Sequence, residues 1–282
     1  MKIAAFNIID SIEESDINDF KQSVEFFQGK GFNVLVPNDS YTENKEQEIK
    51  EDFERLIDRK PLIAIPTFCK KNEINFIKKV NWKKISKSQT IFCGNSFVTP
   101  FLNSIIKFTN NTVLYGPNFI SNFNLDSKET IYIDLIQKST KQNKLEELNT
   151  QSAKFFGKKV VKGNLVGGEI NSYIEMYSTG YINKVSKKDV LLIDGIFETK
   201  KDVEEVIEKL TKLKIINKLK AIIICESVME NQELLESFLL GFKKIAKANL
   251  VAGIKGMMSE DIEIVKLNRE VIIDFKNNKI TQ

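Results

Sequence analysis

Short apolar runs alternate with amphipathic stretches along the first half of the chain, and this alternation constrains the fold more than any other feature. Runs of strand length occupy residues 2–6, 33–36, 61–65, 90–93 and 113–115. The stretches between them carry apolar side chains at helical spacing, such as Phe20, Val24 and Phe27 before Gly29. Strands that alternate with helices indicate βαβ units and a parallel sheet. We therefore predict an open, doubly wound α/β sheet, whose ligands bind at the carboxyl ends of its strands.

The second half shows the same pattern after a polar interval. Residues 137–151 have few apolar positions, which is typical of a linker or a surface helix. Apolar runs follow at residues 190–193, 221–224, 250–251 and 271–273, with amphipathic stretches at 201–213 and 231–247. In a chain of 282 residues, this predicts an α/β domain over 1–135, a linker over 136–160 and a second α/β domain over 161–282.

The composition excludes several classes of site. The chain contains no histidine, so zinc sites with histidine ligands and a triad with histidine as the base are ruled out. The net charge is only +4, and Arg55, Arg59 and Arg269 are the only arginines, which does not favour nucleic-acid recognition. We expect no metal and no cofactor.

Other features indicate location and the state of the thiols. No apolar run approaches the roughly 18–20 residues of a membrane-spanning helix. The first residues are unlike a signal peptide, and we expect a cytoplasmic protein with no membrane partner. Cys69, Cys93 and Cys225 have no motif spacing, and we interpret them as small buried apolar residues.

Residues 92–99 (FCGNSFVT) hold the clearest candidate for chemistry. A strand should end at Gly94 and a helix should begin after Ser96, a turn that exposes a hydroxyl near the backbone N–H groups of a helix start. The alternative is that Ser96 caps the helix, a frequent role of serine. The local pattern favours the cap, because Val98 stands where a G-x-S-x-G elbow has its second glycine.

Two further segments carry candidate residues. Residues 163–168 (GNLVGG) indicate either a close backbone approach to a ligand or a tight connection into the second domain. No Gly-Lys-Ser/Thr follows them, so they are not a phosphate loop. Asp194 ends the run 190–193, a position typical of a functional carboxylate and equally of a cap at the start of a loop.

Taken together, these segments resemble the family of LD-carboxypeptidases and microcin C immunity proteins, which are serine peptidases. Residues 41–58 resemble the family's tyrosine, turn and acidic helix, and residues 94–99 its G-Y-S-D-I-T segment. Residues 115–118 (YGPN) resemble its H-G-P-N turn, and residues 163–170 (GNLVGGEI) its G-x-L-x-G-G-N-L. Residues 177–181 and 190–194 follow like its G-T-x-Y and I-L-F-L-E-D.

The resemblance implies a fold, a reaction and a set of site residues. The fold would be an N-terminal flavodoxin-like domain with a C-terminal domain that carries part of the site, commonly as a homodimer. The family hydrolyses an amide next to a carboxylate, in muropeptide tetrapeptides or in aminoacyl sulfamoyl-adenosine toxins. Ser96 would be the nucleophile and Asp194 the acid of the triad. The ligand-binding positions would be Gly94, Asn95, Asn118, Gly167 and Gly168.

The chain departs from the family pattern at the base. The family's histidine falls on Met258, whose thioether cannot accept a proton from serine at neutral pH. The glycines that form the family's oxyanion hole fall near Phe68, Cys69 and Lys70 and are absent. We therefore expect a catalytically impaired member that binds a small peptide or an aminoacyl nucleotide. One alternative is an active, rewired Ser–Lys hydrolase with Lys255 or Lys70 as the base. The other is a non-catalytic ligand-binding or immunity protein.

Overall fold

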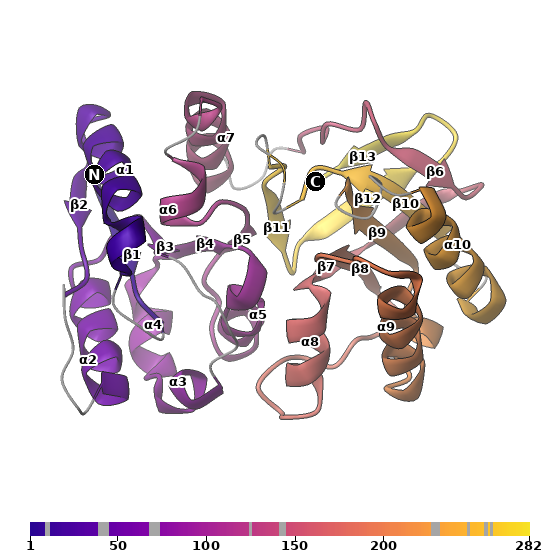
Figure 1. Cartoon of the computed structure of the whole chain (residues 1–282), viewed down its shortest axis with the longest axis horizontal. Coiled ribbons are helices and arrows are strands. Elements are labelled where there is room, and N and C mark those ends of the chain that lie inside the picture. The colour runs from indigo at the N-terminus through magenta and orange to yellow at the C-terminus, as the bar shows by residue number, and fades with distance from the viewer. Residues whose placement is uncertain are drawn as a thin grey trace. The chain divides into compact units, whose positions relative to one another are not determined.

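The computed structural model describes residues 1–8, 12–38, 45–67, 74–123, 126–140, 145–226, 232–246, 249–256, 259 and 262–282. The chain divides into two units, Met1–Gln142 and Asn143–Gln282, and each is built around its own sheet (Figure 1). The predicted α/β fold class is confirmed.

The described residues of the first unit form five parallel strands at the predicted places. They are β1 (Lys2–Phe6), β2 (Asn33–Leu35), β3 (Ile63–Pro66), β4 (Ile91–Gly94) and β5 (Val113–Tyr115). They pair in the order β2-β1-β3-β4-β5, the flavodoxin-like order. The strand order has a switch point between β1 and β3, because β2 lies on one side of β1 and β3 to β5 lie on the other. Ligands of such sheets bind at the carboxyl edge near that switch point.

Helices cover both faces of this sheet (Figure 1). One face carries α1 (Ile17–Gly29), α6 (Phe119–Asn122) and α7 (Lys128–Thr140), and the short turn η1 (Glu14–Asp16) precedes α1. The other carries α2 (Lys45–Asp58), α3 (Ile74–Lys79), α4 (Trp82–Ser88) and α5 (Thr99–Phe108), and the turn η2 (Ser96–Val98) leads into α5. Phenylalanine side chains fill the core beneath α2 and α5. The ring centroid of Phe53 lies 5.1 Å from that of Phe6 and 5.6 Å from that of Phe101.

In the second unit, the described residues form a mixed, seven-stranded sheet. Its strands are β6 (Lys154–Phe156), β7 (Val160–Glu169), β8 (Asp189–Asp194), β9 (Ala221–Cys225), β10 (Asn249–Ile254), β12 (Glu270–Asp274) and β13 (Lys279–Thr281). They pair in the order β13-β12-β7-β8-β9-β10-β6, with β7 to β10 parallel and the outer strands antiparallel. The short strand β11 (Val265–Leu267) precedes β12. The parallel strands bring four carboxyl ends to one edge.

Helices α8 (Ile170–Tyr177), α9 (Lys200–Lys212) and α10 (Gln232–Ala246) connect the parallel strands and lie side by side (Figure 1), and the turn η3 (Ile216–Lys218) follows α9. Of the stretch predicted as a linker, residues 136–140 end α7 and residues 154–156 form β6. The glycine-rich residues 163–168 were interpreted as a close approach or a connection, and they lie inside β7.

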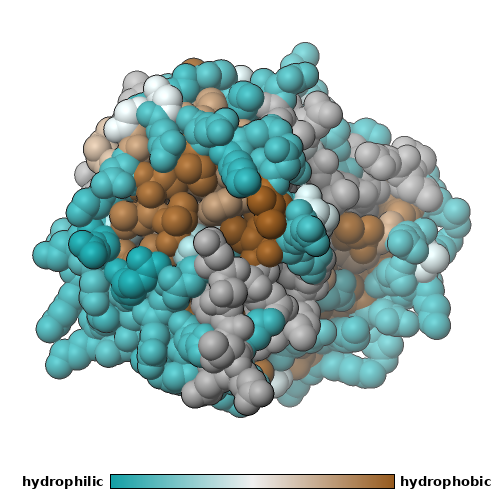
Figure 2. Space-filling view, turned by 60° about the vertical axis from the view of Figure 1, so that its left-hand side comes forward, coloured by the Kyte–Doolittle hydropathy of each residue, from teal (hydrophilic) through white to brown (hydrophobic). Residues whose placement is uncertain are grey.

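The surface carries the alternating charges that the sequence places on helix faces. Lys201 pairs with Glu205 and Lys212 with Glu208 along α9, and all four side chains are at least half exposed. Figure 2 shows one face of the molecule as mainly hydrophilic, with brown apolar patches among teal side chains. The charged side chains of α9 therefore form a solvated helix face. Within the described residues, no helix has the length and apolar character needed to cross a membrane.

Candidate active site

Ser96 lies in a sharp turn between a strand and a helix. Strand β4 ends at Gly94, Asn95 is extended (φ −144°, ψ −168°), and Ser96 then has a left-handed φ of +57°. A left-handed backbone at a residue other than glycine costs on the order of 1–2 kcal/mol and persists only where surrounding contacts enforce it. A strained serine between a strand and a helix at the carboxyl edge of a sheet is the geometry of a nucleophile elbow.

The interpretation of Ser96 as a helix cap is wrong. The residue that precedes η2 is Asn95 and the residue that precedes α5 is Val98, and neither makes a side-chain capping hydrogen bond. Within the described part of the first unit, the Ser96 hydroxyl has no hydrogen-bond partner, and the residue is partly exposed. The hydroxyl is therefore presented at the edge of the sheet and is not used to stabilise the helix.

Three of the predicted ligand-binding residues, Gly94, Asn95 and Asn118, come together beside Ser96. The side-chain oxygen Oδ1 of Asn118 accepts a hydrogen bond from the backbone N–H of Asn95 (3.1 Å). Its Nδ2 donates to Oδ1 of Asn95 (2.8 Å). Both asparagines are at most 4% exposed. The side-chain amide of Asn118 therefore engages both the backbone and the side chain of Asn95 at the base of the elbow.

Sequence reasoning missed a second polar pair at this edge. Asn7 follows β1 and Thr67 follows β3, the two strands on either side of the switch point in the strand order. The Thr67 hydroxyl donates to Oδ1 of Asn7 over 2.6 Å, and both residues are 2% exposed. The available signal was a polar residue directly after each of two buried strands. The pair belongs to a buried polar edge that contains amides and hydroxyls.

In the second unit, Asp194 ends β8 and is completely buried. Its Oδ1 accepts a hydrogen bond from the backbone N–H of Gly195 (2.9 Å). The backbone of Gly256 also packs against it, because a Cβ atom on that glycine would come within 2.7 Å of the same oxygen. Asp194 therefore packs against the backbone of Gly256, two residues before position 258, where the resemblance places the histidine.

Glu169, which ends β7, is the register neighbour of Asp194. It occupies the place of the asparagine in the family's G-G-N-L segment. Its carboxylate accepts hydrogen bonds from the backbone N–H groups of Asn171 (3.1 Å) and Ser172 (2.8 Å), and it also accepts one from the Ser172 hydroxyl. Glu169 thus caps α8, since a carboxylate is favourable at a helix N-terminus.

Lys255, a candidate substitute base, is engaged by a carboxylate. Its Nζ lies 2.9 Å from Oε2 of Glu226, which directly follows β9. A nearby carboxylate stabilises the protonated ammonium, whereas a general base must be deprotonated. The other candidate base, Lys70, lies outside the described residues, as do Met258 and Cys69.

Glycine in β7 allows this strand to pack closely against β8. A Cβ atom on Gly167 would come within 2.3 Å of the carbonyl oxygen of Leu192, and the φ of this glycine is +114°. Gly168 follows with φ +128°. Gly167 therefore permits the close approach of β7 to β8, which a residue with a side chain would prevent.

Both described cysteines are buried thiols, as predicted. Burial is the largest cause that raises the pKa of the Cys93 thiol. Burial also raises the pKa of the Cys225 thiol, and the charges of Asp194 and Glu226 add to the effect. Neither thiol is suited to act as a nucleophile at neutral pH, because the thiolate is the reactive form.

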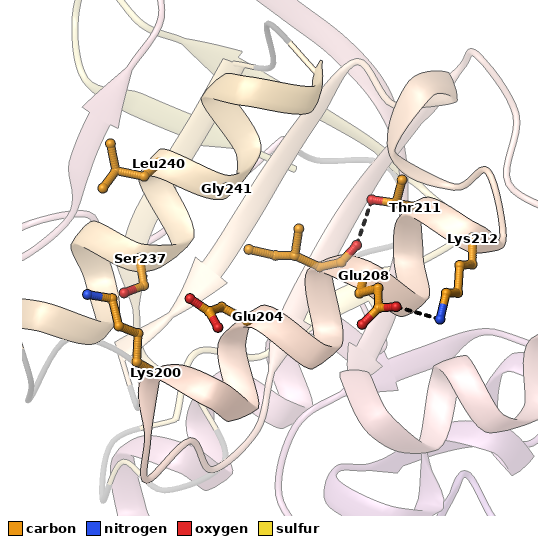
Figure 3. A pocket seen from close by; sticks show the side chains of 9 residues that line it. Lys200, Glu204, Glu208, Thr211, Lys212, Ser237, Leu240 and Gly241 are labelled. Carbon is orange, nitrogen blue, oxygen red and sulfur yellow. Dashed lines mark hydrogen bonds and ion pairs between the residues drawn. The ribbon is translucent and has the colours of Figure 1, made fainter.

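A groove of about 500 Å³ lies between α9 and α10 (Figure 3). Ile207 and Gly241 line it, Leu240 is exposed beside it, and Glu208 and Lys212 pair with each other along α9. No predicted site residue lines this groove. Within the described residues, no group of three or more cysteine, aspartate or glutamate side chains could hold a metal ion.

Fold and elbow define a two-unit α/β protein with a strained serine at the carboxyl edge of a flavodoxin-like sheet. No family model matches the chain. A Vibrio cholerae protein named "Putative carboxypeptidase VC_A0337" is 24% identical over 238 residues, which cover 73% of this chain and 71% of that protein. The microcin C7 self-immunity protein MccF of Escherichia coli is 21% identical over 240 residues, which cover 73% of this chain and 70% of MccF.

Solved structures show the same fold. MccF in complex with glutamyl sulfamoyl guanosine has a TM-score of 0.86 at 20% identity, over 99% of this chain and 95% of that one. Muramoyltetrapeptide carboxypeptidase from Oxalobacter formigenes has a TM-score of 0.80 at 17% identity, over 100% and 97%. With the two sequence relatives, they confirm the predicted resemblance to the LD-carboxypeptidase and microcin C immunity family.

Proposed function

We propose that this chain binds a small ligand with an amide next to a carboxylate, at a site that includes Ser96, and that it does not hydrolyse this ligand to a detectable extent. The observation that carries the proposal is Ser96 itself, whose backbone is strained and whose hydroxyl does not cap the helix, in a chain that contains no histidine. The backbone strain favours a functional role for the hydroxyl. The hydroxyl lacks the residue type that most often activates such a nucleophile.

The size of the catalytic defect follows from the chemistry of serine hydrolases. Removal of a triad histidine lowers turnover about 10⁶-fold and leaves the roughly 10³–10⁴-fold that binding and the oxyanion hole supply. In this chain the family's oxyanion-hole glycines are also absent from the sequence near Lys70. We therefore expect the function of the site to be ligand binding and not catalytic turnover.

The names of the solved structures support a ligand class. MccF has been solved with glutamyl sulfamoyl guanosine, with aspartyl sulfamoyl adenosine and, as a tryptophan variant, with adenosine monophosphate. Another neighbour is a muramoyltetrapeptide carboxypeptidase. We accordingly propose an aminoacyl nucleotide as the first ligand class and a cytoplasmic muropeptide tetrapeptide as the second. A homodimer in the cytoplasm remains part of this proposal.

The experiment combines ligand binding with a search for product. A ligand at one hundred times its Kd stabilises the folded state by about 2.7 kcal/mol, which raises the melting temperature by several degrees. We expect aspartyl or glutamyl sulfamoyl adenosine to raise the melting temperature of the wild type and of Ser96→Ala. Mass spectrometry should detect no product that depends on Ser96.

Each half of the proposal has its own contrary result. A melting temperature that stays constant across sulfamoyl nucleosides and a muropeptide tetrapeptide would contradict ligand binding. Product formed by the wild type and not by Ser96→Ala would contradict impairment. In that case Lys255→Met, with an unchanged Glu226, would show whether the ion-paired lysine is the base after all.

A further inference from the structure

The backbone of Ser96 requires an explanation, because a left-handed φ of +57° is unfavourable for a residue other than glycine. An ordinary start to this helix would place Asn95, a preferred capping residue, with its side chain on the N–H groups of residues 97 and 98. Asn95 precedes η2 in the extended conformation but makes no such bond. Some other contact must therefore hold its side chain away from the helix start.

That contact is the side-chain amide of Asn118. Its Nδ2 donates to Oδ1 of Asn95 over 2.8 Å, and Oδ1 is the atom that a capping asparagine would use. Its own Oδ1 accepts from the backbone N–H of Asn95 over 3.1 Å. One amide thus binds both the side chain and the backbone of the residue before Ser96. Because the site is buried, loss of either bond would leave an unpaired polar group.

Asn118 is itself fixed in place. Its backbone N–H donates to Oδ1 of Asn122 over 3.0 Å. Gly94 allows the amide to approach, since a Cβ atom there would lie 3.2 Å from Oδ1 of Asn118 and 3.0 Å from Cγ of Pro66. The backbone N–H of Gly116 donates to the carbonyl of Gly94 over 3.0 Å and joins the ends of β4 and β5. The amide is therefore held between two strand ends before it reaches Asn95.

We infer that Asn118 is a positioning residue. It keeps Asn95 extended and prevents the Asn95 side chain from capping the helix. As a result, the backbone of Ser96 stays left-handed and its hydroxyl stays exposed at the edge of the sheet. The inference rests on the proposed role of Ser96 in ligand binding. The amide of Asn118 acts on the elbow and does not need to touch the ligand.

The test is a crystal structure of Asn118→Ala without ligand. We expect Ser96 to relax to a helical φ of about −60° and Oδ1 of Asn95 to accept a hydrogen bond from the backbone N–H of residue 97 or 98. Asn118→Asp is the second variant, in case Asn118→Ala does not fold. It keeps the acceptor for the backbone of Asn95 and loses the donor to its side chain, so the Asn95 side chain should turn to the helix.

Asn111→Ala is the matched control. The Asn111 amide also bridges separate segments, because its Nδ2 donates to the carbonyl of Thr90 over 2.9 Å, just before β4 begins. This variant should lower the melting temperature but leave Ser96 at a φ near +57°. A left-handed Ser96 in Asn118→Ala or Asn118→Asp would overturn the inference. Serine-dependent turnover by the wild type would overturn the proposed function and leave the φ measurement as decisive as before.

Discussion

The carboxyl edges of the two sheets differ in charge. The edge of the first sheet carries buried amides and hydroxyls, in the pairs Asn7–Thr67 and Asn95–Asn118. The edge of the second carries carboxylates, of which Asp194 is fully buried. Hydrogen bonds between neutral groups hold their geometry at any physiological pH, whereas carboxylates contribute charge. The chain therefore has one edge that positions a hydroxyl and another that supplies negative charge.

This difference shows what the chain lacks. An imidazole can accept a proton from a hydroxyl and then be stabilised by a carboxylate, which is how a triad joins two such groups. The sequence has no imidazole, and Lys255 on the charged edge is already paired with Glu226.

The largest expected effect comes from adding that group. Met258→His should raise hydrolysis of aspartyl sulfamoyl adenosine about 100-fold or more over the wild type, because general acid–base catalysis contributes roughly 10²–10⁴-fold. Mass spectrometry of timed reactions measures the rate. Met258→Gln, which has similar size and no base, and Met258→His with Ser96→Ala should both stay at the wild-type rate. Equal rates in all four proteins would refute this explanation of the impairment.

The next largest effect concerns the close packing of Gly256 against Asp194 at the charged edge. Gly256→Ala places a methyl group 2.6 Å from Cβ of Cys225 and 2.7 Å from Oδ1 of Asp194. Overpacking of this kind lowers the free energy of unfolding by about 1–3 kcal/mol, which urea denaturation can measure. Gly29→Ala is the control, since nothing lies within 4 Å of its added Cβ. Equal stability of the two variants would show that Asp194 is not enclosed as described.

A third effect compares the thiols at the two edges, Cys93 in β4 and Cys225 at the end of β9. Burial raises the pKa of both, so the unfolded chain loses these protons first as the pH rises above about 8.5. The free energy of unfolding should then fall by up to about 1.4 kcal/mol per pH unit for each thiol. Urea denaturation from pH 7 to 10 measures the slope. Cys93→Ala and Cys225→Ala should each make it shallower, and an unchanged slope in either variant would contradict burial of that thiol.

The smallest effect concerns the Lys255–Glu226 ion pair. Both side chains are about 30% exposed, so a double-mutant cycle with Lys255→Met and Glu226→Gln should give a coupling energy of about 0.2–1 kcal/mol. The coupling should shrink in 1 M salt, because exposed charges are screened. A coupling well above this range, insensitive to salt, would mean that the charged edge is drier than its exposure indicates.

The sheets could be predicted because their signal is local. The run that became β5 (Val113–Tyr115) and the heptad-like spacing of α9 can be read from neighbouring residues. Strand β7 was not recognised as a strand, because glycine is depleted in strands and its glycines satisfy a close approach to β8 that the sequence does not reveal.

The site could be located from the sequence but not interpreted. Ser96 stands where the pattern of strand, turn and helix predicts it, yet its local sequence favours a cap. The deciding contact comes from Asn118, 23 positions beyond Asn95. Lys255 is similar, because its partner Glu226 is brought to it by the parallel pairing of β9 with β10. Contacts between strand ends depend on the completed sheet, and composition and spacing do not encode them.

The bond between the two asparagine amides also affects how the protein ages. Asparagine is among the thermolabile residues, and it deamidates most readily before a small residue, when the next backbone nitrogen can attack its side-chain carbonyl. Asn95 precedes Ser96, but Asn118 engages its carbonyl oxygen and both residues of that pair are buried. The folded chain thus protects the dipeptide from a reaction that would put a carboxylate beside the hydroxyl. Chemical damage at this site should therefore depend on the fraction of time that the segment is open, because deamidation is slow relative to refolding.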